Sequence, residues 1–212
     1  MSGDSEMASD PSTPPTRTGV PDWDDEYIDR VADRLMHSYD LARDSDVRGE
    51  VFDLYGEMRI ERQKQFFHPS INYANHDSEE YLFARRTTRV RRTDLDSIID
   101  LGHALADEWI ETDETHFSTD FTFVLIAPEI TDEVREFVAG FRDRTLLKLG
   151  MRGHYEVNLV VVAPDKQEAK QEQEPDIVKS KNADVGAAFA LWGEPEPESR
   201  GLLDRFVRRL GQ

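Results

Sequence analysis

The densest group of chemically active side chains in this sequence is a run of five arginines. They lie within eight residues, in the segment FARRTTRVRRTD, as Arg85, Arg86, Arg89, Arg91 and Arg92. Guanidinium groups form paired hydrogen bonds with phosphate and carboxylate oxygens. The run therefore indicates a site that binds an anion or an acidic partner. The competing interpretation is that the protein's own carboxylates pair with these arginines.

A second group of polar side chains stands at the starts of two expected strands. His116 and Asp120 lie on the first strand, and His154 and Glu156 lie on the second. Within each pair the residues are an even number of positions apart, so they share one face of their strand. Two histidines and a carboxylate can bind a divalent metal ion, and paired acids can transfer protons. These four residues are the candidate catalytic group of a metal-assisted or phosphate-handling enzyme, although sites in parallel sheets usually lie at the opposite, carboxyl ends of strands.

Motifs of established catalytic sites do not occur in the sequence. It contains no Gly-x-Gly-x-x-Gly, no Walker loop, no Gly-x-Ser-x-Gly and no His-Glu-x-x-His. It has no cysteine, which excludes disulfides, thiolate nucleophiles and cysteine-based metal sites. His68, His76 and Asp77 are expected in a polar loop, where histidines are usually just exposed. We therefore expect neither a cofactor nor a resident metal, and the sequence favours a binding protein over an enzyme.

Charge gives the strongest compositional information. The net charge is −18, and the 26 basic residues are 20 Arg and 6 Lys. A dense acidic surface with few lysines suits molar salt, where the Debye length falls to about 3 Å and like-charge repulsion is screened. The same charge argues against nucleic acid as a partner.

The N-terminal residues lack the apolar segment of a signal peptide, and no apolar run approaches the roughly 18 residues of a membrane span, so we expect a cytoplasmic protein.

Hydrophobic periodicity predicts a single α/β domain over residues 22–192, with a mixed sheet of four to six strands and helices packed on it. The segment from 117 to 164 reads as strand, helix, strand, which predicts a parallel βαβ unit. Residues 1–21 are rich in Ser, Pro and Thr and are expected to be disordered. Expected helices cover 23–43, 95–110 (capped by Thr93 or Asp94) and 129–149. Expected strands cover 50–67 (one long strand or a hairpin), 81–90, 117–127, 154–164, 176–180 and 185–192.

The C-terminal end predicts an amphipathic helix. A Pro- and Glu-rich linker, 193–199, precedes it, and the helix covers 200–212. Such an apolar face must be buried, either on the protein's own domain, on another subunit or partner, or on a membrane surface. We expect a protein partner or a homo-oligomer through this helix. Its apolar face comprises Leu202, Leu203, Phe206, Val207 and Leu210, and Arg205, Arg208 and Arg209 lie largely opposite.

In composition the chain resembles haloarchaeal cytosolic proteins, and overall it looks like the uncharacterised acidic domain proteins of haloarchaea. This resemblance implies a salt-rich environment and no particular activity. The resulting expectation is a non-catalytic binding or adaptor protein of a halophilic cytoplasm. The alternative is the phosphate-handling or metal-assisted enzyme built on the strand-start cluster.

Overall fold

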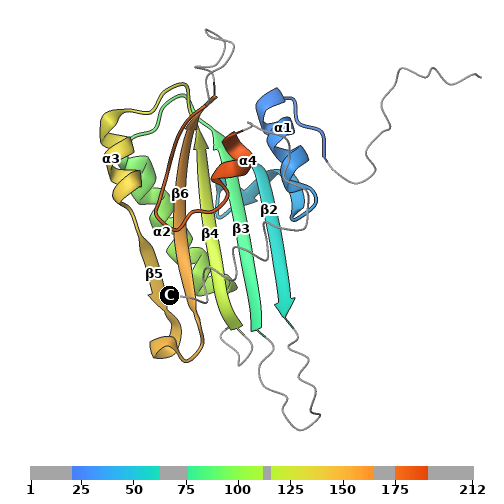
Figure 1. Ribbon diagram of the computed structural model, residues 1–212, viewed down its shortest axis with the longest axis vertical. Helices are drawn as coiled ribbons and strands as arrows, with labels where there is room; N and C mark the ends of the chain where they lie inside the picture. The colour runs from blue at the N-terminus through green and yellow to red at the C-terminus, as the bar shows by residue number, and fades with distance from the viewer. Residues whose placement is uncertain (1–20, 63–75, 112–115, 165–174, 191–212) are drawn as a thin grey trace, which may run out of the picture.

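The computed structural model describes residues 21–62, 76–111, 116–164 and 175–190 (Figure 1). These residues form a seven-stranded mixed sheet with helices on both faces. Along the chain the elements are α1 (Glu26–Leu35), β1 (Asp40–Val47), β2 (Glu50–Arg62), β3 (His76–Arg86), α2 (Arg92–Trp109), β4 (His116–Ile126), α3 (Asp132–Gly140), β5 (Asp143–Leu146), the short 3-10 helix η1 (Leu147–Gly150), β6 (His154–Ala163), β7 (Asp176–Lys179) and α4 (Gly186–Ala190).

The strand order is β1-β2-β3-β4-β6-β5, with β7 also paired to β6. The three central strands β3, β4 and β6 are parallel, and the remaining pairings are antiparallel. Both β3-α2-β4 and β4-α3-β6 are therefore parallel crossover units. The predicted mixed α/β architecture with a βαβ unit is confirmed.

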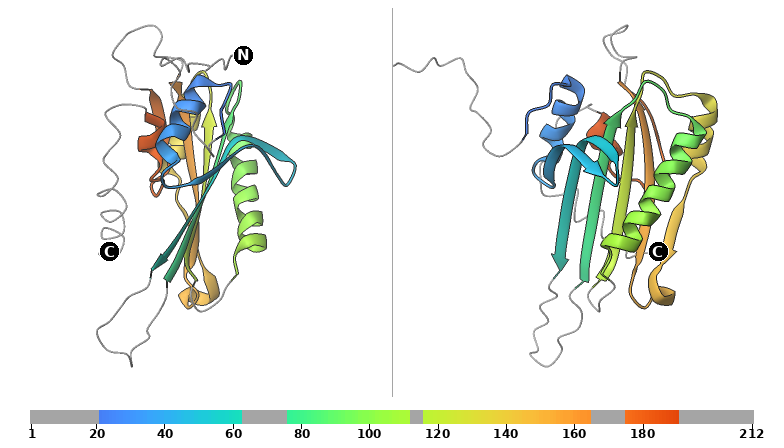
Figure 2. Two further views of the ribbon diagram at one scale, coloured as in Figure 1. Left: turned by 90° about the vertical axis from the view of Figure 1, so that its right-hand side faces the viewer. Right: turned by 180° about the vertical axis from the view of Figure 1, so that it is seen from behind.

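Each face of the sheet carries its own apolar cluster, because successive side chains of a strand point to opposite faces. On one face, α2 and α3 cover Phe83, Phe123, Leu159 and their neighbours. On the other face, α1 and α4 cover Leu54, Val124 and their neighbours. The two layers of helices are seen edge-on in Figure 2.

Helix α2 lies unusually close to the sheet at Gly102. A Cβ atom at this position would stand 2.9 Å from both methyl groups of Val157 and 3.1 Å from the Phe123 ring. The small residue therefore allows α2 to pack closely against β4 and β6.

Two predicted helices are too long. The helix expected over 23–43 ends at Leu35, and β1 follows it. The helix expected over 129–149 ends at Gly140, and β5 follows it. In both cases the apolar side chains keep a helical spacing beyond the end of the helix. The residues that follow nevertheless form strands, because β1 pairs with β2 and β5 pairs with β6. A two-residue turn joins β1 to β2, with positive φ at Arg48 and Gly49, as a tight hairpin requires.

Three smaller expectations also need correction. Residues 185–192, expected as a strand, include the helix α4. The strand expected over 81–90 is β3, which begins at His76 and ends at Arg86, so His76 and Asp77 belong to a strand and not to a loop. The next helix begins at Arg92, three residues earlier than expected. The cap residue of that helix is Arg91 rather than Thr93 or Asp94. The head (residues 1–20), the linker 193–199, the tail 200–212 and His68 lie outside the described residues.

Candidate functional site

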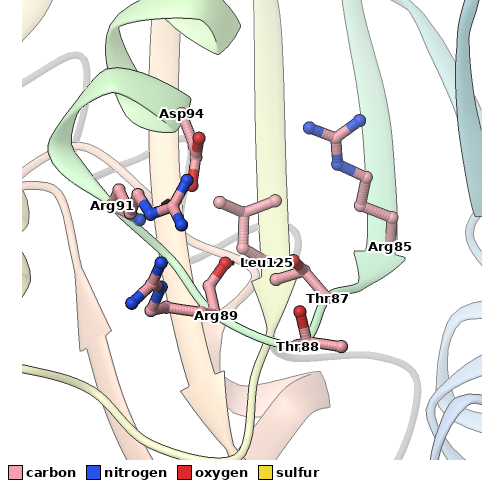
Figure 3. A pocket seen from close by; sticks show the side chains of 7 residues that line it. All are labelled: Arg85, Thr87, Thr88, Arg89, Arg91, Asp94 and Leu125. Carbon is pink, nitrogen blue, oxygen red and sulfur yellow. Dashed lines mark hydrogen bonds between the residues drawn. The ribbon is translucent and has the colours of Figure 1, made fainter.

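A pocket of about 560 Å³ lies where the carboxyl ends of β3 and β4 meet the start of α2 (Figure 3). Its volume falls in the range of small-molecule sites, roughly 300–1,000 Å³. The carboxyl ends of parallel strands are also the usual place for ligand binding in such sheets. Its lining consists of Arg85, Thr87, Thr88, Arg89, Arg91, Asp94 and Leu125.

The pocket places cations around an apolar floor. Arg85 stands on one side and Arg89 and Arg91 stand on the other, with Leu125 between them (Figure 3). Leu125 is buried in the sheet, whereas Arg89 and Arg91 are exposed. The pocket lining therefore contains three guanidinium groups and a single carboxylate, that of Asp94.

Local structure explains how these side chains come together. After β3 ends, the Thr87 N–H donates to the carbonyl of Ile126 (2.8 Å), which ties the loop to the end of β4. The Thr87 hydroxyl donates to the carbonyl of Arg89 (3.0 Å) and fixes the next turn. The Asp94 carboxylate accepts the Arg91 N–H (2.8 Å) at the start of α2. The strand end, the loop and the helix start thus each contribute arginine to the pocket.

Three of the five arginines of the run are held by the protein's own carboxylates. Arg85 pairs with Glu50 and lies over the Phe52 ring, 5.5 Å from its centroid. Arg86 pairs with Asp25, the residue just before α1, and Arg92 pairs with Asp96 within α2. Arg92 also lies 3.5 Å from the centroid of the Phe137 ring.

The ion pair of Arg86 affects the acid that caps α1. Burial would raise the pKa of the Asp25 carboxyl. The hydrogen bond from Arg86 and those from the N–H groups of Ile28 and Tyr27 outweigh that effect, so this pKa lies below its ordinary value. Both side chains therefore serve the fold, because Asp25 caps α1 and Arg86 pairs with Asp25.

Arg89 and Arg91 differ from these three. Among the residues that the structure describes, no ion pair or side-chain hydrogen bond uses either guanidinium group. Both belong to the pocket lining. Their positive charge is therefore available to a ligand, in a chain whose net charge is −18.

The candidates at the strand starts lie on the opposite side of the sheet, on the face of α1. Asp120 and Glu156 are direct cross-strand neighbours, and Glu80 stands beside Asp120 on β3. The side chain of His154 lies on the same face, with its Nε2 atom 3.6 Å from Glu156 Oε1. Asp120, His154 and Glu156 are thus brought together, with exposed fractions of 5%, 6% and 2%.

His116 is not part of that group. A shift in the pairing of β3 with β4 occurs at Asp77 and Ser78, opposite the start of β4. The His116 ring contacts the Arg152 carbonyl through Nδ1 (2.7 Å) and the Thr119 hydroxyl through Nε2 (2.9 Å). Because a carbonyl only accepts, Nδ1 carries the proton. Thr119 and Asp120 are consecutive in β4, so their side chains point to opposite faces of the sheet. His116 therefore contacts a side chain on the face away from Asp120.

Among the described residues, no group of three or more His, Asp or Glu side chains is arranged to hold a metal ion. The side chains of His76 and Asp77 lie outside the described part, as does His68. None of the helices in the described ranges is both long and apolar enough to cross a membrane.

A family model described as "Domain of unknown function (DUF8052)" matches residues 24–189. The chain belongs to this family. Comparison with curated proteins and with solved structures gave no match.

The DUF8052 domain contains both groups of side chains, since the match extends from just before α1 to the next-to-last residue of α4. The residues that line the arginine pocket, and Asp120, His154 and Glu156 on the opposite face, therefore lie within the matched range. The tail 200–212 lies beyond the match.

The DUF8052 domain also contains a group of three connected polar side chains that the sequence patterns did not predict. His103 of α2 contacts the Tyr155 hydroxyl through Nδ1 (2.9 Å) and the Asp143 carboxylate through Nε2 (3.0 Å). The group connects α2 to β6 and to the edge strand β5. No spacing pattern reveals it, because its members come from three separate segments and β5 was expected to be helical.

Proposed function

We propose that this protein is a non-catalytic binding protein whose arginine pocket receives a phosphate-bearing small molecule. The observation that carries the proposal is the pair Arg89 and Arg91, which line a pocket and make no ion pair within the described part of the chain. Acids outnumber bases by 44 to 26 in this chain. Two pocket arginines that stay out of ion pairs under that excess are best explained by an external anion.

The chemistry of the lining supports a phosphate group. Arginine presents a planar fork of donors that matches two oxygens at once. The hydroxyl of Thr88 adds a neutral donor to the same lining. The start of α2 contributes the positive end of a helix dipole, which favours anions. Asp94 opposes this effect but is occupied by the Arg91 N–H.

The alternative enzyme has less support. Asp120, His154 and Glu156 do converge, and this is the observation in its favour. However, His116 is engaged elsewhere, and the three side chains are at most 6% exposed. A substrate needs access to the groups that act on it, so a binding role for the arginine pocket is the better supported function.

Inorganic pyrophosphate is the probe for this proposal. Added to the full chain at constant KCl, it is expected to raise the melting temperature. At a concentration 100 times its Kd, a ligand stabilises the folded state by about 2.7 kcal/mol, and for a domain of this size that corresponds to roughly 5–10 °C. Differential scanning fluorimetry measures the shift.

Two controls make that result decisive. KCl added to the same ionic strength corrects for screening, and a glutamate-rich peptide tests an acidic protein partner. Stabilisation by the peptide and not by pyrophosphate would contradict a phosphate ligand and favour an adaptor role. No stabilisation by either compound would contradict anion binding altogether.

We also propose that the protein works in the concentrated salt of a halophilic archaeal cytoplasm. The net charge of −18 and the ratio of 20 Arg to 6 Lys support this. Screening of like charges then stabilises the folded state. The melting temperature is expected to rise continuously as KCl increases from dilute buffer to molar concentration. A melting temperature that is already maximal in dilute buffer, with a monodisperse protein, would contradict the salt adaptation.

A further inference from the structure

The turn that joins β5 to β6 exposes a group of apolar side chains. Among the described residues four large apolar side chains are exposed, and three of them lie within the six residues 146–151 of this turn. Leu146, Leu149 and Met151 are 60%, 93% and 78% exposed. Single exposed apolar residues are normal on a protein surface, but a contiguous group indicates an interaction site. These three side chains are the apolar tip.

The backbone of the turn holds the apolar tip in an unfavourable conformation. Lys148, Leu149 and Gly150 have φ values of 46°, 62° and 86°, and only glycine adopts such values without strain. The Leu147 N–H donates to the Gly153 carbonyl (3.0 Å), which closes the base of the turn. The chain therefore has a lysine and a leucine where the backbone favours glycine. Strain of this kind indicates that the side chains themselves have a role.

Positive charge accompanies the apolar tip. Between residues 141 and 153 the sequence has four basic side chains and one acidic side chain, Asp143. The Asp143 carboxylate contacts Nε2 of His103 (3.0 Å). Arg142 and Lys148 are exposed, and within the part of the chain that the structure describes neither side chain forms an ion pair or a hydrogen bond. This turn is therefore a basic feature of a chain whose net charge is −18.

The apolar tip and the arginine pocket lie at opposite ends of the sheet. The tip precedes the start of β6, which lies beside the start of β4 (Figure 1). The pocket lies at the carboxyl ends of β3 and β4. Because β4 has 11 residues, its two ends are roughly 35 Å apart, at about 3.3 Å per residue. A surface that binds the tip therefore leaves the pocket open to solvent.

We propose that the apolar tip inserts into the surface of an anionic lipid bilayer and that Arg142 and Lys148 contact the headgroups. A stable protein interface takes about 20–30 residues from each side, far more than this tip offers. A bilayer needs no matching groove, because each apolar side chain is buried among the lipid chains independently. Basic residues near an anionic surface add to the attraction. This inference does not depend on the arginine pocket.

The excess of negative charge in the rest of the chain does not prevent this approach. At 0.15 M salt the Debye length is about 8 Å, and at molar salt it is about 3 Å. The strands β4 and β6 extend away from the tip over a much longer distance. Repulsion between distant carboxylates and the bilayer is therefore screened, whereas the burial of apolar side chains does not rely on charge. The acidic surface instead orients the protein with its basic turn toward the bilayer.

Leu149→Gly in the full chain tests the proposal. Glycine removes the most exposed side chain of the tip and suits the positive φ. Binding to vesicles of phosphatidylglycerol and phosphatidylcholine in equal parts should weaken roughly tenfold, and the melting temperature should not fall. Vesicle flotation measures binding at the lowest KCl concentration at which circular dichroism shows a folded chain. The unaltered chain should bind vesicles of phosphatidylcholine alone at least about threefold more weakly.

Two control variants separate the tip from other surfaces. Val51 is the fourth exposed large apolar side chain of the described residues, and it lies in the hairpin of β1 and β2. Val51→Ser should therefore leave vesicle binding unchanged. Arg89→Ala combined with Arg91→Ala should also leave it unchanged, because the arginine pocket lies at the other end of the sheet.

Four results would overturn the proposal. The first is no binding to the mixed vesicles, or binding that Leu149→Gly does not weaken. The second is equal binding to both kinds of vesicle, which would remove the role of the two cations. Loss of binding in the Arg89 and Arg91 double variant would mean that lipid phosphates enter the arginine pocket. Self-association without vesicles that Leu149→Gly abolishes, measured by light scattering, would identify a second copy of the chain as the occupant of the tip.

Discussion

Replacing Arg89 and Arg91 together with alanine is expected to weaken pyrophosphate binding by roughly 100-fold or more. Hydrogen bonds to charged groups contribute about 1.5–3 kcal/mol each, and every 1.4 kcal/mol is a factor of about ten in affinity. Both residues line the pocket and make no ion pair among the described residues. Their removal should therefore leave the melting temperature of the free protein nearly unchanged. Isothermal titration calorimetry measures the affinity.

Arg92→Ala is the matched control for that pair of substitutions. Arg92 belongs to the same run, but it pairs with Asp96 and lies over Phe137, outside the pocket lining. Its loss should lower stability slightly without changing pyrophosphate affinity. Equal weakening by Arg92→Ala would mean that pyrophosphate responds only to overall charge. Unchanged affinity in the double variant would remove Arg89 and Arg91 from the site.

Gly153→Ala is expected to lower the free energy of unfolding by about 3 kcal/mol. Gly153 has φ +75°, and a Cβ atom there would lie 2.1 Å from the carbonyl oxygen of Phe117. A left-handed conformation costs other residues about 1–2 kcal/mol, and forced overlap adds about 1–3 kcal/mol or more. The melting temperature should fall by roughly 6–12 °C. The substitution acts where β6 begins beside the start of β4.

Two other glycines separate the causes of that effect. Gly49 has φ +84° and open space around its Cβ position, so Gly49→Ala should show the conformational cost alone, about 1 kcal/mol. Gly140 has open space and no positive φ, so Gly140→Ala should be nearly neutral. Urea unfolding of the three variants measures the order. If Gly153→Ala costs no more than Gly49→Ala, the close approach of β4 to Gly153 is wrong.

The central part of the fold could be predicted from the sequence because its elements have strong, simple patterns. The strands at 116–126 and 154–163 each end in a continuous apolar run (123–127 and 159–163), and the amphipathic helix between them identifies a parallel unit. The edge strands β1 and β5 could not be predicted. Their residues kept a helical spacing of apolar side chains, and pairing with β2 and β6 overrides that local preference.

The arginine run was evident in the sequence, but the pocket was not. The alternation expected for a strand does not apply beyond Arg86, where the chain turns into a loop and then α2. Which arginines remain available depends on Glu50 and Asp25, which lie 35 and 61 residues away from their partners. No pattern in the run itself encodes those long-range pairings, so the special position of Arg89 and Arg91 emerges only from the folded structure.

Side-chain nuclear magnetic resonance gives the most direct test of anion binding in the pocket. Proton–nitrogen correlation spectra resolve the Nε–Hε groups of arginines, and Lys substitutions at single positions assign Arg89, Arg91 and Arg92. With added pyrophosphate, the resonances of Arg89 and Arg91 should shift and saturate together, while that of Arg92 stays in place. Arginine resonances that all drift in proportion to ionic strength, without saturation, would contradict the proposed site.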